Sequence, residues 1–383
     1  MLNVQSIPQR LAMSLSTIVA VAMAVAVLLG FLALSNGFRA TMAGTGAEDI
    51  AIINRKGATS ELSSIISSEQ VTLLEAAPGL RAEGGAPLVS PELYLIVDGV
   101  KRSTGTSANM PLRGITETGV ALRQNATITE GRIFTPGTNE IVVGRGLLRE
   151  FAGFELGKDV KLGANTWRVV GVFDAPGTVF ESELWADAHV VQSLFNRGSS
   201  VQIVRAALTS PAAIEAFRQY NDDDPRLQLE VRTERDFYAS QSEGMSDLIG
   251  YIGWPLGIVM AIGALAGALN TMYSSVAARA GEIATLRIIG FSGFAAFVGT
   301  LVEALALSAI GALVGALFCF IFFNGMSAST MGGNFTQVVF KLQLSPELIW
   351  QALIMALIIG LIGGFFPGLR AASTRPQLEL AAQ

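Results

Sequence analysis

The sequence predicts a membrane protein with four transmembrane α-helices and a large α+β extracytoplasmic domain between the first and second helices. Hydrophobic residues make up 51% of the 383 residues and charged residues only 15%, which is too apolar for a soluble protein of this length. Four apolar segments are long enough to cross about 30 Å of hydrocarbon as helices, which takes roughly 20 residues. Between the first two lie about 210 residues of ordinary globular composition, enough for one or two folded domains.

Short charged flanks orient the chain, because long domains do not count in the positive-inside rule. Five arginines would share one side, with Lys341 alone in the short loop on the other; they are Arg10, Arg279, Arg287, Arg370 and Arg375. The predicted order is a cytoplasmic N-terminus (1–14), a first span (15–35), the large external domain (36–247), a second span (248–273), a cytoplasmic segment (274–293), a third span (294–323), a short external loop (324–347), a fourth span (348–368) and a cytoplasmic tail (369–383).

The first apolar segment follows Arg10 near the N-terminus, where a cleaved signal peptide would also begin. Its apolar run of about 20 residues exceeds the 7 to 15 of a typical signal peptide, so we expect an uncleaved anchor. The one cysteine, Cys319, falls in the third span, and the external domain therefore contains no disulfide. Packing must stabilise that domain.

Periodicity within the external domain predicts a mixture of helices and strands. A helical pattern runs over 60–77 until Pro78 and Gly79 stop it. The further segments predicted are strands at 94–97, 140–143, 159–162 and 166–173 and short helices at 146–151, 188–195 and 211–220. A stalk or helix over 230–247 leads back to the membrane. Strands and helices without a regular alternation indicate an α+β domain, with two subdomains left open.

Composition and motifs exclude several classes of function. The external domain has 27 acidic and 20 basic residues, a formal charge of −7, and nothing indicates nucleic-acid binding. The segment 153–159 has three residues between its glycines instead of the four of a phosphate loop. The one histidine, His189, has no partners for a zinc site. We therefore predict no catalytic, metal-binding or cofactor-binding residues in this chain.

The most informative segment is the charged patch at 275–290, which lies between two apolar spans. Arg279 and Glu282 are three residues apart and can pair on one face of a helix. Ile283, Leu286 and Ile289 recur at intervals of three on another face. A short helix along the membrane surface fits this pattern. It could simply join two spans, or it could be a docking element for a cytoplasmic protein.

The stretch Glu282-Ile-Ala-Thr-Leu-Arg287-Ile-Ile-Gly290 resembles the cytoplasmic signature of MacB/FtsX-type ABC transporter permeases. Six residues match the pattern: Arg279, Glu282, Ile283, Leu286, Arg287 and Gly290. Gly281 and Ala284 depart from it, because a basic residue and a glycine are common there. Segments 131–136, 140–144 and 156–173 look like the core of that family's periplasmic domain, and Pro367 to Arg370 looks like its C-terminal exit. The resemblance covers most of the chain.

The resemblance implies a function without catalysis in this chain. Family members are permease subunits that couple ATP hydrolysis by cytoplasmic ATPases to periplasmic conformational change, a mode called mechanotransmission. The six matching residues would contact the ATPase. Only about 14 residues precede the first span, so we expect the ATPase, with its ATP and magnesium, to be a separate chain. The implied location is the bacterial inner (plasma) membrane.

The resemblance also implies partners and leaves the cargo open. We expect a second permease copy, with a homodimer favoured over a heterodimer, membrane lipid, and for efflux a periplasmic adaptor and an outer-membrane channel. Efflux is the favoured function. Lipoprotein or lipid extraction of the Lol type and FtsX-like signalling to a periplasmic hydrolase remain alternatives, and no nucleic acid is expected.

Two features inside the spans complete the prediction. The small-xxx-small pairs Gly253/Gly257 and Gly263/Gly267 of the second span allow close helix approach, within one subunit or at a dimer seam, and the resemblance favours the seam. Glu303 lies in the third span, where an uncompensated charge would cost several kcal/mol. It is expected to be protonated, to lie nearer the surface, or to pair with a polar group such as Asn270.

Overall fold

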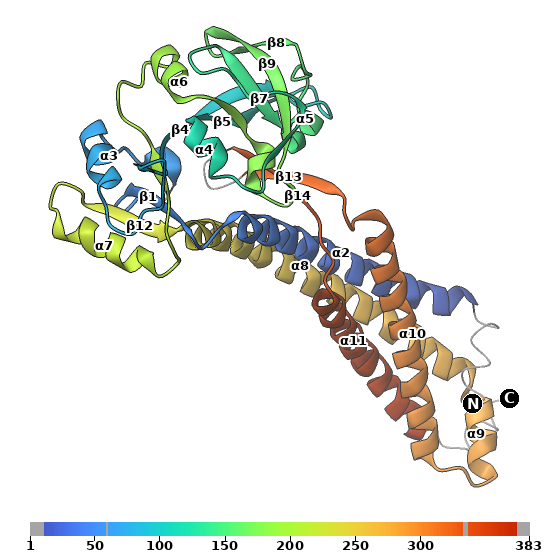
Figure 1. The fold of residues 1–383 in the computed structure, drawn as a ribbon. Helices are drawn as coiled ribbons and strands as arrows, with labels where there is room; N and C mark the ends of the chain where they lie inside the picture. The colour runs from blue at the N-terminus through green and yellow to red at the C-terminus, as the bar shows by residue number, and fades with distance from the viewer. Residues whose placement is uncertain (1–10, 59, 332–335, 374–383) are drawn as a thin grey trace. The chain divides into compact units, whose positions relative to one another are not determined.

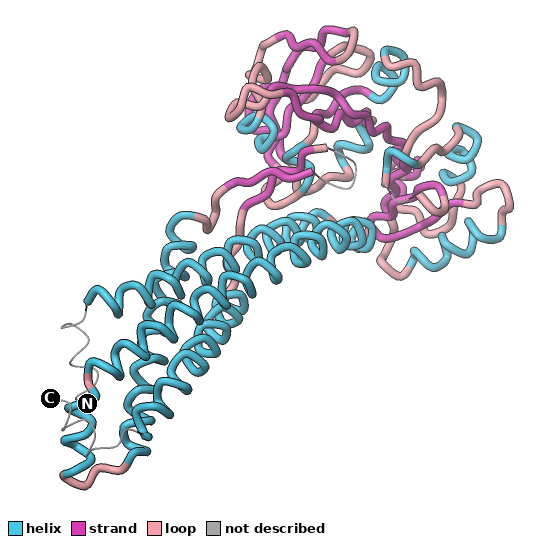
Figure 2. Tube along the Cα trace, turned by 180° about the vertical axis from the view of Figure 1, so that it is seen from behind, coloured by secondary structure: helices cyan, strands magenta, loops and turns pink. Residues whose placement is uncertain are grey.

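The computed structural model describes residues 11–58, 60–331 and 336–373, and their contacts form two compact units. The helical unit lies within residues 11–36, 247–326 and 342–373, and the sheet unit comprises Gly37–Ser246 together with Ser327–Lys341. Figure 1 labels the elements, and Figure 2 separates helices from strands by colour. The sheet unit is therefore built from two separate stretches of sequence.

Four helices are long and apolar enough to cross a membrane, by length and composition. They are α2 (Leu11–Thr45), α8 (Glu234–Ala278), α10 (Gly293–Phe322) and α11 (Pro346–Ser373). With the mixed sheet unit described below, they confirm the predicted fold class. Two helices are longer than the predicted spans: α2 continues beyond residue 35, and α8 begins well before residue 248, directly after a strand.

Small residues let the helices of the helical unit pack closely. A Cβ at Gly311 of α10 would lie 2.8 Å from Val21 Cβ of α2, and one at Gly360 of α11 would lie 2.7 Å from Ser308 Oγ of α10. α10 and α11 run side by side in both views (Figures 1 and 2). Cys319 is buried and its Sγ contacts the carbonyl oxygen of Ala26 at 3.5 Å. Close approach between these helices depends on positions without a bulky side chain.

Ten strands of the described sheet unit form one mixed sheet with the order β12-β1-β11-β4-β5-β10-β7-β9-β6, and β8 pairs with β9. The strands are β1 (Ile50–Arg55), β4 (Val89–Val100), β5 (Ser107–Ile115), β6 (Thr127–Gly131), β7 (Glu140–Gly144), β8 (Asp159–Leu162), β9 (Asn165–Asp174), β10 (Leu184–Asp187), β11 (Ile203–Ala207) and β12 (Leu229–Thr233). β2 (Ala82–Glu83) pairs with β3 (Ala86–Pro87), and β13 (Ser327–Met331) with β14 (Gln337–Lys341).

The short helices are η2 (Glu61–Ser63), α3 (Ser68–Glu75), α4 (Glu117–Ala121), α5 (Arg145–Glu150), η3 (Val179–Ser182), α6 (Ala188–Leu194) and α7 (Ala213–Asp223). One helix predicted from the sequence, over 60–77, is wrong in its first half. Ile66 instead forms an antiparallel bridge with Val201, and α3 starts only after Ser67. Ser67 and Gln70 form a reciprocal capping box, which fixes the start of the helix.

The external loop predicted at 324–347 is also different in the structure. Its central part is the antiparallel hairpin of β13 and β14, which belongs to the sheet unit. α8 remains helical to Ala278, past residue 274 where the cytoplasmic segment is predicted to start, and that boundary stays a prediction.

The two faces of the sheet differ in chemistry, as β4 shows. Leu93, Leu95 and Val97 face an apolar core that also contains Phe217 of α7 and Val191 of α6. The intervening residues Glu92 and Tyr94 lie on the opposite face, because successive side chains of a strand alternate. Both are buried as well.

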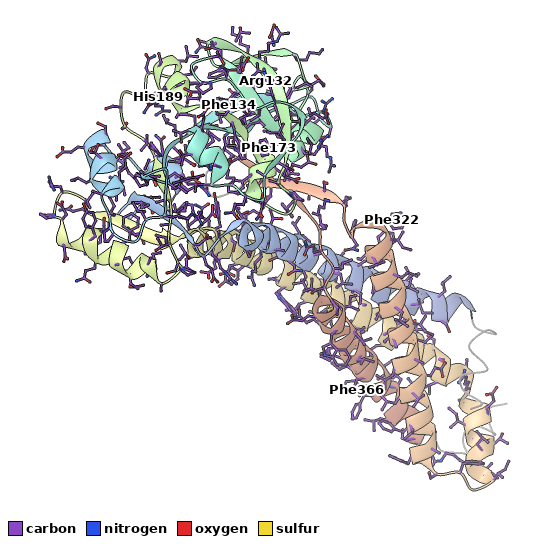
Figure 3. The ribbon with its side chains drawn as sticks, in the orientation of Figure 1. Arg132, Phe134, Phe173, His189, Phe322 and Phe366 are labelled. Atoms are coloured by element: carbon purple, nitrogen blue, oxygen red, sulfur yellow. The ribbon has the colours of Figure 1, made fainter. Side chains whose placement is uncertain are left out.

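Aromatic rings and arginines share this second face. Phe173 of β9, labelled in Figure 3, stacks on Trp185 of β10 with ring centroids 3.8 Å apart. Phe180 of η3 meets Trp185 and Tyr238 of α8 edge to face, at 6.2 and 6.1 Å. The guanidinium of Arg123 lies 4.9 Å from the centre of the Phe180 ring, within reach of a cation–π contact.

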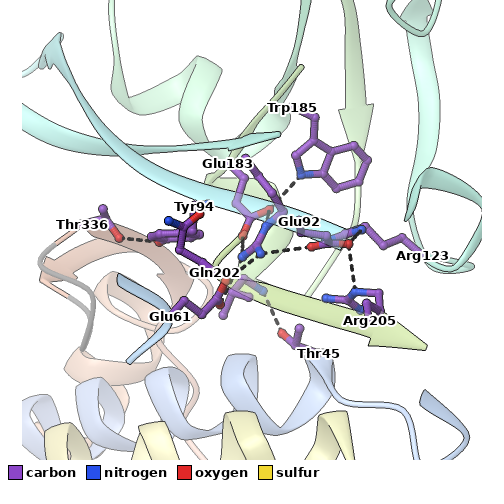
Figure 4. Close-up of polar contacts among 12 residues, drawn as sticks. Thr45, Glu61, Glu92, Tyr94, Arg123, Glu183, Trp185, Gln202, Arg205 and Thr336 are labelled. Carbon is purple, nitrogen blue, oxygen red and sulfur yellow. Dashed lines mark hydrogen bonds and ion pairs between the residues drawn. The ribbon is translucent and has the colours of Figure 1, made fainter. Parts of the chain in front are cut away.

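At the centre of this face, four glutamates and three arginines form a buried charge cluster. Figure 4 labels Glu61, Glu92, Glu183, Arg123 and Arg205 among them. The members are Glu61, Glu92, Glu183, Glu234, Arg113, Arg123 and Arg205, and each is 3% exposed or less. Arg113 of β5 donates to Glu61 and to Glu183, with closest distances of 2.7 Å to each. These charges are tolerated in the interior because each is paired and hydrogen-bonded.

Glu92 is the most connected carboxylate of the cluster. It accepts from Arg123 at 2.7 and 2.8 Å and from Arg113 at 3.2 Å, and Arg205 Nε lies 3.3 Å away. Burial alone would raise its pKa, but Arg123 and Arg205 outweigh burial and hold the pKa at about 2. Glu92 therefore stays ionised.

The cluster also fixes the ends of both long helices that enter the sheet unit. Arg205 of β11 donates to Glu234, the first residue of α8, and the other oxygen of Glu234 accepts from the backbone N–H of Ala47, just after α2. The Thr45 hydroxyl, at the end of α2, accepts from the N–H of Val179 at 2.8 Å. The α2 terminus and the α8 start are thus bonded to the same sheet face.

The β13–β14 hairpin attaches to the sheet unit through side chains. The hydroxyls of Tyr94 and Thr336 lie 2.9 Å apart, and Ser182 Oγ accepts from the N–H of Val339 at 2.8 Å. Lys101 Nζ contacts Glu150 Oε1 at 3.2 Å and Gln337 Oε1 at 3.1 Å. The hairpin is held by several polar contacts and is more than a connecting loop.

We expect Glu92→Gln to lower the stability of the sheet unit by about 3–5 kcal/mol, because three buried guanidiniums lose their shared counter-charge. The stabilisation that Glu92 provides is present above its unfolded-state pKa of 4.5 and is lost as pH falls towards about 2. The difference in stability between the wild type and Glu92→Gln should therefore become small at low pH. Thermal unfolding of the full chain in detergent, from pH 7 to pH 3, measures this.

Glu130→Gln is the matched control, because Glu130 pairs with Arg145 at the surface and its side chain is 48% exposed. Its effect should stay within about 0.5 kcal/mol. Equal stability of the two variants at pH 7 would contradict a central role for Glu92.

Candidate functional site

The site is the segment between α8 and α10, which contains the short helix α9 (Ala280–Ile288). α8 ends at Ala278, and Arg279 leaves the helical conformation with φ −105° and ψ 9°. α9 then runs to Ile288, and Ser292 caps α10 by accepting from the N–H of Ala295 at 3.3 Å. Ser is a favoured N-cap residue because its hydroxyl satisfies an otherwise free N–H of the first turn.

Gly290 allows the chain to change direction between α9 and α10. Its φ is +108°, a conformation that side chains with a Cβ rarely adopt. A Cβ built there meets no atom within 4 Å, so backbone conformation and not space requires the glycine. The glycine of the sequence motif thus has a local structural reason.

Arg279 and Glu303 form a buried ion pair between the start of α9 and α10. Arg279 Nη1 donates to Glu303 Oε2 at 3.0 Å, and the side chains are 8% and 6% exposed. Of the alternatives predicted for Glu303, pairing is the one observed, and Arg279 is the partner found instead of Asn270. The pair ties α9 to the third span, since a buried charge is costly without its counter-charge.

Arg287 fixes the other end of α9. Its Nη1 donates to the carbonyl oxygen of Ala372 at 2.9 Å, in the last turn of α11. A Cβ at Gly293 would lie 2.7 Å from the same oxygen, so the start of α10 also approaches α11 closely. α9 is thereby held against two helices.

The remaining motif residues leave a charged and apolar surface open. Glu282 and Gly290 are exposed, Leu286 is 40% exposed, and Ile283 is half-buried. Ile289 and Phe294 next to them are each 72% exposed. A groove of about 710 Å³ runs along α9 and the first part of α10, lined by Glu282, Leu286 and Arg287 among others. The surface offers apolar contact flanked by charges, as a docking face does.

The structure separates the six motif residues by location. Arg279 and Arg287 bond within the chain, whereas Glu282, Leu286 and Gly290 face outward. Their predicted role as contacts for an ATPase remains a prediction. Within the described residues, no three His, Cys, Asp or Glu side chains gather in a way that could hold a metal ion.

The four glycines of the second span do not share one role. Cβ atoms at Gly253 and Gly257 would lie 2.7 and 2.9 Å from Phe31 and Leu28 of α2, so these two serve packing within the chain. Gly263 is exposed, and a Cβ added there would meet nothing within 4 Å, whereas one at Gly267 would lie 3.9 Å from Ala20. Of these four glycines, Gly263 is the one that leaves an open position on α8.

Two family models match the chain. Residues 14–220 match the MacB-like periplasmic core domain, and residues 256–376 match the FtsX-like permease C-terminal domain. The chain is 26% identical over 293 residues to the macrolide export ATP-binding/permease protein MacB 1/2 of Paracoccus denitrificans (strain Pd 1222), covering 72% of this chain and 42% of that protein. It is 25% identical over 343 residues to MacB of Sodalis glossinidius (strain morsitans), covering 82% and 49%.

Two solved extracytoplasmic domains are similar to part of the chain. The periplasmic region of MacB from Actinobacillus actinomycetemcomitans is 16% identical and has a TM-score of 0.37, covering 50% of this chain and 92% of that chain. The extracellular domain of the noncanonic ABC-type transporter YknZ from Gram-positive bacteria is 18% identical and has a TM-score of 0.36, covering 48% and 99%.

The chain spans about half the length of the curated relatives it matches. The model of the periplasmic core alone covers more than half of the chain, and the permease model covers the second half of α8 and all of α10 and α11. The chain therefore belongs to the MacB/FtsX-type family of ABC transporter permeases.

Proposed function

We propose that this permease is driven by a cytoplasmic ABC ATPase carried on a separate chain, that α9 is the coupling helix which docks on it, and that the movement is passed to the sheet unit. The observation that carries the proposal is the construction of α9. Its outer surface is apolar and charged, while Arg279 and Arg287 tie it to α10 and α11. A force applied to α9 would therefore also act on α10 and α11 through these two bonds.

Chain connectivity and the charge cluster support the second half of the proposal. α9 follows α8, and α8 begins at Glu234, which is bonded to Arg205 in the centre of the sheet. α8 is therefore the element through which a displacement of α9 would reach the sheet unit. This is mechanotransmission: the work of ATP hydrolysis in the partner changes the conformation of the external domain.

Export is the favoured direction of transport, since both curated relatives are named as macrolide export proteins. A periplasmic adaptor and an outer-membrane channel would complete such a system. Lipoprotein extraction and signalling to a periplasmic hydrolase predict different companions. Affinity purification of the tagged chain from mildly solubilised membranes, followed by mass spectrometry, separates these possibilities. Recovery of no ATPase with an otherwise intact complex would overturn the proposal.

We further propose that two copies of the chain pair through α8. One face of α8 is exposed and apolar, with Val259 63% and Ile262 62% exposed. Gly263 lies beside them without a neighbour within 4 Å among the described residues. Small residues on an exposed apolar helix face favour association in membranes, because they allow backbones to approach.

Leu286→Ala should weaken ATPase binding about tenfold or more, because truncation removes apolar area that the partner would bury. The measurement is the affinity of the purified ATPase for the full chain in lipid nanodiscs, together with stimulated ATPase activity. Leu361→Ala is the matched control, since Leu361 of α11 is 47% exposed but lies far along the sequence from α9. Normal binding by Leu286→Ala would exclude α9 as the docking element.

Gly263→Ile should lower the dimer fraction while leaving the fold of each copy intact, because its side chain would enter open space. Gly257→Ile should instead disturb the fold, since Leu28 lies 2.9 Å from the new Cβ. Disulfide formation by Val259→Cys in a Cys319→Ser background measures the dimer directly. Unchanged cross-linking of the Gly263→Ile variant would place the dimer contact elsewhere.

A further inference from the structure

The buried charge cluster is not electrically balanced. It holds four carboxylates, Glu61, Glu92, Glu183 and Glu234, against the three guanidiniums of Arg113, Arg123 and Arg205. With every group ionised, the cluster would carry one uncompensated negative charge in the protein interior. An unpaired buried charge is expensive, and a group in that position neutralises instead.

Hydrogen bonding identifies the carboxylate that is held most weakly as an anion. Glu183 accepts from two nitrogens of Arg113 and from Trp185 Nε1 at 2.8 Å. Glu92 contacts all three arginines, and Glu234 accepts from Arg205 and from a backbone N–H. The donors to Glu61 among the described residues all belong to Arg113, at 2.7 and 3.2 Å, and Arg113 serves two other carboxylates too.

A small cavity lies beside Glu61. Its volume is about 30 Å³, and its lining includes Glu61, Arg113, Tyr238 and Gln241. Tyr238 is 2% exposed, and neither its hydroxyl nor Gln241 Nε2 bonds to a described protein atom although both atoms are buried. One water molecule fits such a volume and needs two to four polar partners. These groups supply them.

We propose that Glu61 is a proton-binding site of the sheet unit and that a water molecule in this cavity connects it to Tyr238 and Gln241 of α8. The proton comes from solvent water and binds a carboxylate oxygen of Glu61, which changes from −1 to neutral. The cluster then has three carboxylates and three guanidiniums. The weaker contact, Arg113 Nη2 to Glu61 Oε1 at 3.2 Å, marks the oxygen that is freer to carry the proton.

The charged and titratable groups around Glu61 agree with this assignment. Burial raises the pKa of Glu61, Arg113 of β5 lowers it, and Glu183 and Glu92 raise it again, with a net increase above 4.5. From α8, Tyr238 faces the cavity as a neutral phenol, because burial raises its own pKa well above 10. Tyr94 of β4 is neutral for the same reason.

A regulatory role for the Glu61 proton site rests on the proposed coupling function. Tyr238 and Gln241 lie in the part of α8 that follows Glu234, so the proton and its water bond the sheet to the helix that would transmit movement. Loss of the proton would leave a repelling negative charge at this joint. External pH would therefore tune coupling without any change at α9.

Glu61→Gln tests the assignment, because glutamine keeps the size of the protonated acid and cannot ionise. A raised native pKa gives stability that is complete below pH 4.5 and is lost as pH rises through the native value. The wild-type unfolding temperature, measured on the full chain in detergent without ATPase, should fall relative to Glu61→Gln as pH rises above 4.5. The expected difference in unfolding temperature between the two proteins is about 3 °C or more for each unit by which the pKa of Glu61 is raised.

Infrared spectroscopy gives an independent readout. Wild-type protein at neutral pH should show the carbonyl stretch of a buried protonated carboxylic acid, absent from Glu61→Gln. Glu130→Gln, whose side chain is 48% exposed and lies outside the cluster, is the control: it should keep this band and the wild-type pH dependence. Tyr238→Phe removes one hydrogen-bond partner of the cavity water. The shift of the Glu61 carbonyl band on H₂O/D₂O exchange should therefore be smaller in this variant.

The same pH dependence in wild type and Glu61→Gln, or the absence of the protonated band, would overturn the proposal. Neither result depends on an ATPase, so the proton site and the coupling function fail separately. With ATPase present, stimulated activity that responds to external pH in wild type but not in Glu61→Gln supports the regulatory meaning. An identical response in both would remove that meaning and leave the site itself intact.

Discussion

The sheet unit depends on the burial of Glu92 among three arginines. Charges in a protein interior are tolerated only when their partners are present and correctly placed. These partners come from two strands and a turn: Arg113 from β5, Arg205 from β11 and Arg123 from the turn after α4. The cluster therefore makes the central strands mutually dependent. The same requirement extends to the first residue of α8, because Glu234 accepts a hydrogen bond from Arg205. Apolar packing could stabilise a sheet of this size, but it would not fix the start of a helix so specifically.

The segment around α9 uses the same physics on a smaller scale. A single buried pair, Arg279 with Glu303, and a bond from Arg287 to a helix-terminal carbonyl attach α9 to its neighbours. The charged residues of the motif thus have two roles. The arginines are structural anchors inside the chain, and Glu282 with Leu286 is left for a partner. A residue-by-residue match to a family pattern cannot distinguish these tasks, because both kinds of residue follow the same helical spacing.

Much of the fold could be predicted from sequence, and the failures have physical causes. The four spans follow from apolar length, and β8 matches its predicted bounds because Gly and Pro punctuate alternating residues clearly. The central strands β10 and β11 were missed, since buried charges such as Arg205 interrupt the apolar pattern that identifies a strand. The helix predicted at 60–77 failed because Ile66 pairs with a distant strand, which local periodicity cannot reveal. The charge cluster was invisible for a related reason: its members are spread over some 170 residues, and only the fold brings them together.

The discontinuity of the sheet unit has a consequence for how the protein is made. Residues 327–341 belong to this unit but follow three of the four spans in the sequence. During synthesis the hairpin appears only after α10, so the bonds of Tyr94 and Ser182 to the hairpin cannot form until the third span has been produced. Final folding outside the membrane is then conditional on the progress of insertion. A fragment that ends before α8 would retain the strands of the large sheet but would lack the β13–β14 hairpin that bonds to it through side chains.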